Sequence, residues 1–226
     1  MPCVPSAEVC NGRDDDCDSA VDESCPASLA WDVASKRTNL GDSQGGSEFS
    51  DTCAGDEALA GINLAVGAWV DQVQGVCRKL TLVTAPDRSP YEYSVLLGAP
   101  RTLAAHPEVS ASPRQDLICS GNALLVGVRI SQQSSGSPAS VVVPQIWLNC
   151  AEPILKVDAT PPSISWQSLS TIGPASGSYA NQTAYFEEDA IKSPQILVGL
   201  QGSSGNWLDR IGVASANVAV LFRAAH

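Results

Sequence analysis

An acidic run near the N-terminus holds the side chains best suited to metal chemistry. Aspartates recur at every second position from Asp14 to Asp18, which is how the oxygen ligands of calcium loops are spaced. The candidate ligands, all hard oxygen donors, are Asp14, Asp16, Asp18, the carbonyl of Ala20, Asp22 and Glu23. Such donors favour calcium over copper or zinc. Ser19 and Cys25 stand where a helix-loop-helix calcium site has glycine and glutamate, so the predicted site is a different kind of calcium loop.

Four cysteines surround this acidic run. Residues 1–25 hold seven carboxylates and one basic side chain, and such a segment alone is typical of an extended, disordered tail. Nested disulfide bonds from Cys3 to Cys25 and from Cys10 to Cys17 would instead hold the carboxylates together around a cation. We therefore predict a disulfide-clasped calcium-binding cap over residues 1–26, with an acidic linker as the alternative.

The segment "EVCNGRDDDCDSAVDE" resembles a short metal-binding motif of secreted bacterial proteins, usually written E-x-C-D-G-x-D-N-D-C-D-G-x-x-D-E. The chain departs from that pattern at Asn11, Asp15 and Ser19. The resemblance covers about the first 25 residues and implies a secreted bacterial protein that binds a metal ion here.

The composition limits the class of protein. The chain has 226 residues, a formal net charge of −11 and eight cysteines. An even number of cysteines without a C-x-x-C pair indicates an oxidising compartment, so we expect a secreted or cell-surface protein. The acidic balance and the lack of a basic patch exclude a nucleic-acid partner, and no run of roughly eighteen apolar residues predicts a membrane span.

Three copies of one unit follow, over residues 53–77, 119–150 and 191–215. A glycine stands eight residues after Cys53, Cys119 and Ile191, respectively, at Gly61, Gly127 and Gly199. The first two copies end in Cys77 and Cys150, whereas the third has lost both of its cysteines. Paired loss is what a bonded pair predicts, so we expect disulfide bonds from Cys53 to Cys77 and from Cys119 to Cys150.

Each copy consists of two short apolar runs separated by Gly and Ser residues, a pattern typical of antiparallel strands. One such unit cannot bury its apolar face alone, but three around an axis can. We predict an all-β, three-fold pseudo-symmetric β-prism over residues 27–226, with repeats at about 27–84, 85–151 and 152–226. A β-sandwich is the alternative fold.

The segments "GGSEFSD" (45–51), "GAWVDQVQ" (67–74) and "SGNWLDRIGV" (204–213) resemble the jacalin-type lectins. That resemblance implies a β-prism of three Greek-key sheets, as also occurs in the vitelline membrane outer layer protein. It also implies a sugar site made of a glycine-rich first loop and a G-x-x-x-D loop. The residues that match the second loop are Gly205, Asn206, Trp207, Leu208 and Asp209, and in the first copy Gly67, Ala68, Trp69, Val70 and Asp71. The middle copy has Val142 and Pro144 instead of the Trp and Asp, so we expect no sugar site there.

Two function classes remain open from the sequence. The first is a secreted, calcium-binding and lectin-like module whose partner is a glycan or a cell-surface polysaccharide. An ionised carboxylate can accept hydrogen bonds from two sugar hydroxyls, and a glycine turn can offer backbone N–H donors. The alternative is a structural cell-surface or extracellular-matrix protein with a calcium-stabilised cap and no sugar binding. We expect no enzyme, because neither His106 nor His226 has a nucleophile or base at a recognisable spacing.

Overall fold

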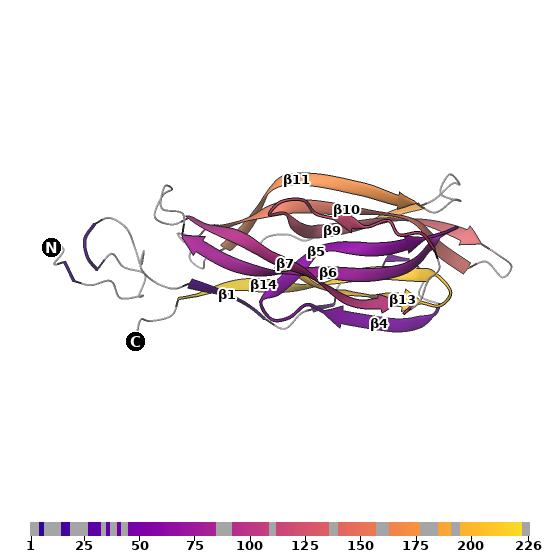
Figure 1. Cartoon of the computed structure of the whole chain (residues 1–226), viewed down its shortest axis with the longest axis horizontal. Coiled ribbons are helices and arrows are strands. Elements are labelled where there is room, and N and C mark those ends of the chain that lie inside the picture. Colours follow the sequence, from indigo (N-terminus) through magenta and orange to yellow (C-terminus); the bar gives the residue numbers. More distant parts are fainter. Residues whose placement is uncertain are drawn as a thin grey trace.

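In a computed structural model, the fold is built from β-strands. The described residues are 5–6, 15–18, 27–32, 35–36, 40–41, 45–84, 92–108, 112–135, 140–156, 163–176, 185–190 and 195–222. Within these ranges no helix is long and apolar enough to cross a bilayer. The long strands run roughly parallel to the long axis of the molecule (Figure 1).

The first sheet combines both ends of the chain. Its order is β1-β14-β13-β4, and the short strands β2 and β3 also pair with β14. The strands are β1 (Ala27–Trp31), β2 (Ser35–Lys36), β3 (Leu40–Gly41), β4 (Ser47–Thr52), β13 (Gln195–Ser204) and β14 (Leu208–Phe222). The N-terminal strands β1 to β4 therefore belong to the same sheet as the C-terminal hairpin β13–β14.

The second and third sheets are Greek keys, in which the fourth strand returns to pair with the first. The second sheet has the order β7-β6-β5-β8, and in the third β12 and β10 flank β9 while β11 pairs with β10. Their strands are β5 (Glu57–Val66), β6 (Val70–Thr84), β7 (Glu92–His106), β8 (Leu117–Ile118), β9 (Leu124–Ser135), β10 (Ser140–Lys156), β11 (Ser163–Ser176) and β12 (Tyr185–Ala190). A short pairing of Ile154–Lys156 with Glu92–Ser94 joins the two sheets.

These three sheets form the predicted prism rather than the sandwich that was the alternative. The three central hairpins, β5–β6, β9–β10 and β13–β14, contribute fully buried side chains to one shared core, among them Leu59, Ile62, Leu125, Ile130, Ile146 and Leu197. No single hairpin could bury these residues alone, which is why the three copies must pack together. The sheets group the chain differently from the sequence repeats, since β6 and β7 pair across the boundary near residue 84.

The glycine shared by the three copies marks a close approach between strands. Gly61 pairs with Ile118, Gly199 with Thr52 and Gly127 with Ala190. A Cβ atom on Gly61 would lie 2.5 Å from the carbonyl oxygen of Leu117, and one on Gly199 would lie 2.6 Å from that of Asp51. At Gly61 and Gly199 the neighbouring backbone therefore requires glycine, which explains its regular place in these two copies.

The two predicted disulfide bonds of the prism are present. Cys53 bonds to Cys77 and Cys119 to Cys150. Cys53 also donates its backbone N–H to Val198 of β13, so its disulfide bond to β6 ties the first sheet to the second. Cys119 donates in the same way to Ala60 of β5, and its bond to β10 ties the second sheet to the third.

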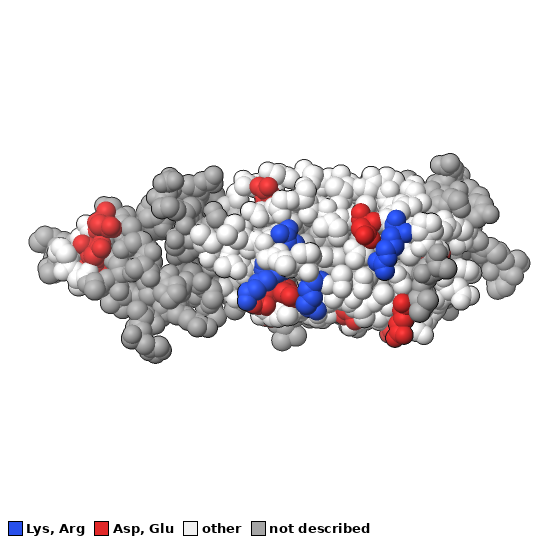
Figure 2. Space-filling model, in the orientation of Figure 1, with Lys and Arg blue, Asp and Glu red and all other residues white. Residues whose placement is uncertain are grey.

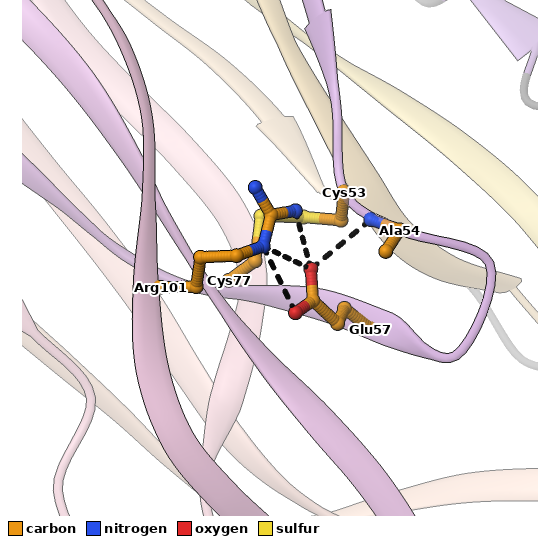
Figure 3. A network of polar contacts seen from close by, with 5 residues as sticks. All are labelled: Cys53, Ala54, Glu57, Cys77 and Arg101. Atoms are coloured by element: carbon orange, nitrogen blue, oxygen red, sulfur yellow. Dashed lines mark hydrogen bonds and ion pairs between the residues drawn. A yellow bond between two sulfur atoms is a disulfide. The ribbon is translucent and has the colours of Figure 1, made fainter.

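An ion pair lies beside the first of these disulfide bonds (Figure 3). Nε of Arg101 donates to Oε1 and Oε2 of Glu57 at 3.0 and 2.9 Å. Oε2 also accepts the backbone N–H of Ala54 at 3.0 Å. Hydrogen bonds from Arg101 hold the pKa of the Glu57 carboxyl below its ordinary value of 4.5, although partial burial opposes the shift. Glu57 therefore fixes the turn that leads from Cys53 into β5.

Candidate functional site

Two turns with the pattern G-x-W-x-D have the same local structure. The turn Gly205–Asp209 joins β13 to β14, and the turn Gly67–Asp71 joins β5 to β6. In each, the glycine N–H donates to the carbonyl oxygen of the tryptophan two residues later, at 3.0 Å. The β13–β14 turn lies at the end of the prism farthest from β1 (Figure 1).

A pair of glycines packs against the Asp209 carboxylate. A Cβ atom on Gly45 would lie 2.6 Å from Cγ of Asp209, and one on Gly46 would lie 2.6 Å from Oδ2. Gly46 also has a φ of 57°, in the left-handed region that favours glycine. Both positions must therefore be glycine for the loop to approach the carboxylate so closely. The structure thus brings together the two loops that the lectin resemblance implied.

The exposed part of this site is largely backbone. Gly46, Gly205 and Asn206 are exposed, and Trp207 is half-buried. Leu208 and Asp209 are buried, with 7% of Asp209 exposed. Asp209 also takes part in polar interactions within the chain. The site therefore presents a glycine surface and an amide side chain, with a carboxylate directly beneath the glycines.

The corresponding aspartate of the first copy has a different neighbour. Oγ of Ser112 donates a hydrogen bond to Oδ2 of Asp71 at 2.5 Å. A Cβ atom on Gly67 would lie 2.7 Å from that Oδ2 and 2.8 Å from the serine Oγ. Ala68, Trp69 and Asp71 are half-buried and Val70 is buried. A side-chain hydroxyl thus occupies the space beside this carboxylate.

The middle copy offers no equivalent carboxylate among its described residues. Val142 and Pro144 both lie buried on β10. In the alignment of the three copies they take the places of the tryptophan and the aspartate of the turn. The link between β9 and β10, residues 136–139, lies outside the described ranges.

Ion pairs lie near the site and elsewhere on the described part of the prism. Arg210, next to Asp209, forms an ion pair with Glu48 of β4. On the face shown in Figure 2, several basic groups of the prism lie beside acidic ones, other acidic groups stand apart, and wide uncharged areas separate them.

The predicted calcium ligands lie mostly outside the described residues. Asp14, Ala20, Asp22 and Glu23 fall there, as do Cys3, Cys10 and Cys25. Oδ1 of Asp16 accepts the backbone N–H of Asp18 at 3.1 Å, and Cys17 between them has a φ of 68° and is disulfide-bonded. Among the described residues, no group of three or more His, Cys, Asp or Glu side chains is arranged to hold a metal ion.

A cluster around His106 was not predicted from the sequence. Its Nε2 atom lies 2.7 Å from Oδ2 of Asp51, and its ring stacks on Phe49 with 4.3 Å between the ring centroids. The cluster joins β4 of the first sheet to the end of β7 in the second, and so helps to hold the strand that follows the glycine pair. Fifty-five residues separate the histidine from the aspartate, and no local spacing could have indicated this contact.

Comparison with known proteins identifies the fold. No family model matches the chain and no curated protein sequence matches it significantly. Among solved structures, artocarpin, described as a lectin with mannose specificity, superposes with a TM-score of 0.53 at 15% identity, covering 81% of this chain and 98% of artocarpin. A mannose-specific jacalin-related lectin from Morus nigra in complex with mannose gives a TM-score of 0.50 at 16% identity, covering 82% and 96%. The chain has the fold of the jacalin-related lectins. The strands of its prism therefore correspond to almost the whole length of those proteins.

Proposed function

We propose that the chain is a carbohydrate-binding module whose sugar site is formed by Gly45, Gly46 and the turn Gly205–Asp209. The observation that carries the proposal is that the Asp209 carboxylate lies directly beneath two glycines, at positions where a Cβ atom would overlap it. Glycines let a ligand approach backbone donors closely, and a carboxylate accepts hydrogen bonds from hydroxyl groups. The half-buried Trp207 would offer an apolar edge to the sugar ring.

Mannose-type sugars are the first ligands to test. Both similar structures named above are described as mannose-specific, and a pyranose presents adjacent hydroxyls that one carboxylate can bind together. The cysteine content and the two disulfide bonds of the prism support a role outside the cytoplasm. The partner would then be a glycan or a cell-surface polysaccharide.

The variant Asp209→Asn tests the site because it keeps the shape of the side chain and removes its charge. Hydrogen bonds to charged groups contribute about 1.5 to 3 kcal/mol, so affinity should fall roughly ten- to a hundredfold. Calorimetry with the methyl α-glycosides of mannose, glucose and galactose, followed by a glycan array, gives the readout. The matched control is Asp116→Asn, which removes the same charge at an exposed position.

The burial of Asp209 favours a second candidate function, a structural surface or matrix protein that binds no sugar. A carboxylate that is only 7% exposed can hold two loops together instead of binding a ligand. The same measurement separates the candidates: equal binding by the wild type and Asp209→Asn, or no binding by either with a lowered melting temperature of the variant, supports the structural role.

We also propose that calcium binds to the N-terminal cap through Asp14, Asp16, Asp18, Asp22 and Glu23, with the carbonyl of Ala20. The turn in which Asp16 accepts the N–H of Asp18 supports the proposal, since it keeps two of these acids close together. A ligand that binds only the folded state raises its stability, so calcium should raise the melting temperature of the cap and a chelator should lower it. Calorimetric titration without heat and without bound metal would remove calcium from the proposal.

A further inference from the structure

The strand register shows which loop residues of the first and third copies are equivalent. Gly199 pairs with Thr52 and Gly61 with Ile118. Four residues further along each hairpin strand, Ser203 pairs with Glu48 and Ala65 forms a bridge with Arg114. The two returning segments therefore follow the same register.

Counting back along these segments places Ser112 where the other copy has Gly46. Gly46 lies six residues before Thr52, which pairs with Gly199. Ser112 lies six residues before Ile118, which pairs with Gly61. Gly46 faces Oδ2 of Asp209, and Ser112 faces Oδ2 of Asp71. The residue above the carboxylate is thus a glycine in one turn and, in the other, a serine whose hydroxyl bonds the carboxylate.

The space beside the two turns differs accordingly. A Cβ atom on Gly205 would meet only the Cα atom of Gly46, at 3.7 Å, which is ordinary contact. The same atom on Gly67 would lie within 2.8 Å of both the Asp71 carboxylate and the Ser112 hydroxyl. Gly46 has left-handed backbone, whereas Cys17 and Ser168 are the non-glycine residues with positive φ in the described part of the chain, so Ser112 does not share that conformation.

We infer that Ser112 closes a second sugar site, because its hydroxyl occupies the position on Asp71 that a sugar hydroxyl would take. This inference rests on the function proposed above for the Gly205–Asp209 turn. The fold holds the serine hydroxyl beside its partner, so a sugar hydroxyl would have to displace a hydrogen bond formed within the chain. The protein therefore binds sugar at one turn of the prism, and the Gly67–Asp71 turn is silent.

The variant Ser112→Gly tests this closure, since it removes the hydroxyl and permits the backbone conformation of Gly46. Calorimetry with the methyl α-glycosides of mannose, glucose and galactose should give one site per chain for the wild type and two for Ser112→Gly. Adding Asp71→Asn to Ser112→Gly should return the stoichiometry to one. Ser112→Thr keeps the hydroxyl and should remain at one site. Ser112→Ala removes the hydroxyl without adding a glycine and should also open the site, which covers the case in which the glycine variant fails to fold.

The outcomes separate this inference from the function on which it rests. Two sites in the wild type, or a single site in both Ser112→Gly and Ser112→Ala, would overturn the closure while leaving the Gly205–Asp209 site in place. Binding by Ser112→Gly through Asp71, with none by the wild type, would support the closure and reject the Gly205–Asp209 site. Absence of binding in every variant would reject both.

Discussion

At the scale of single residues, the neighbours of a carboxylate decide its role more than its motif does. Asp209 and Asp71 end turns with the same glycine-to-tryptophan hydrogen bond. One carboxylate lies under two glycines and the other is bonded to a serine hydroxyl. Glu57 is a third case, because Arg101 and a backbone N–H use its oxygens to fix a turn. The same functional group thus lies beneath glycines in one turn, accepts a serine hydroxyl in the second and fixes the backbone of the third.

The brace at Glu57 gives a prediction for pH dependence. Because hydrogen bonds from Arg101 lower the pKa of Glu57 in the folded chain, the ionised carboxylate adds stability above its ordinary value of 4.5. That stability is lost as the pH falls through the lower folded-state pKa. Glu57→Gln should therefore unfold more easily than the wild type at pH 7, by on the order of 1 kcal/mol, since solvent screens this partly exposed pair.

Thermal unfolding from pH 7 down to pH 2 provides the measurement. The difference between the wild type and Glu57→Gln should shrink as the pH falls below about 4.5. Glu108→Gln, at an exposed position, should match the wild type throughout. A difference that stays constant down to pH 2 would show that Glu57 acts through packing rather than through its charge.

At the scale of elements, the three copies interlock instead of folding as separate units. Each segment that precedes a repeat pairs with the hairpin of another copy, beside the shared glycine. The pairing of β4 with β13 also positions Gly45 and Gly46, which directly precede β4, beside the Asp209 turn. The candidate site therefore depends on a close contact several residues away, at Gly199.

The variant Gly199→Ala tests that dependence. Its Cβ atom would lie 2.6 Å from the carbonyl oxygen of Asp51, and backbone cannot move aside cheaply. Overpacking of this kind costs about 1 to 3 kcal/mol, so the melting temperature should fall, and sugar binding should weaken as β4 shifts. In Gly55→Ala the new atom meets nothing within 4 Å, and this control should melt near the wild-type temperature. Equal stability of the two variants would contradict the close approach of β4 to β13.

Periodic features of the fold were predictable from the sequence, and contacts between loops of different copies were not. The spacing from Cys53 and Cys119 to their glycines indicated repeats, and the joint loss of two cysteines indicated which ones bond. These signals exist because a disulfide bond and a close backbone approach each restrict the residue type at a fixed position. The contacts of Ser112 with Asp71 and of His106 with Asp51 join segments far apart in the sequence, and nothing in the local pattern marks them.

At the scale of the whole molecule, the prism has three junctions between sheets, and two of them carry a disulfide bond. Cys53–Cys77 ties the first sheet to the second and Cys119–Cys150 ties the second to the third. By the spacing of the three copies, the third has Ile191 and Ser215 where the other two have their cysteines, and Ile191 lies outside the described residues. Ser215 is buried, as Cys77 and Cys150 are, which supports the equivalence of this position.

The double variant Ile191→Cys/Ser215→Cys should therefore form a third disulfide bond and close the ring of sheets. Its two positions are as far apart in sequence as Cys53 and Cys77, which are separated by 24 residues. A loop of that length adds about 3 kcal/mol by restricting the unfolded chain, so the melting temperature should rise by several degrees. Thiol titration of the unfolded, non-reduced protein should find no more free thiols than in the wild type, whereas each single variant should show one more. Two additional free thiols in the double variant, without a gain in stability, would show that the third junction is not equivalent to the other two. The pseudo-symmetry of the prism would then not extend to the sheet that is built from both ends of the chain.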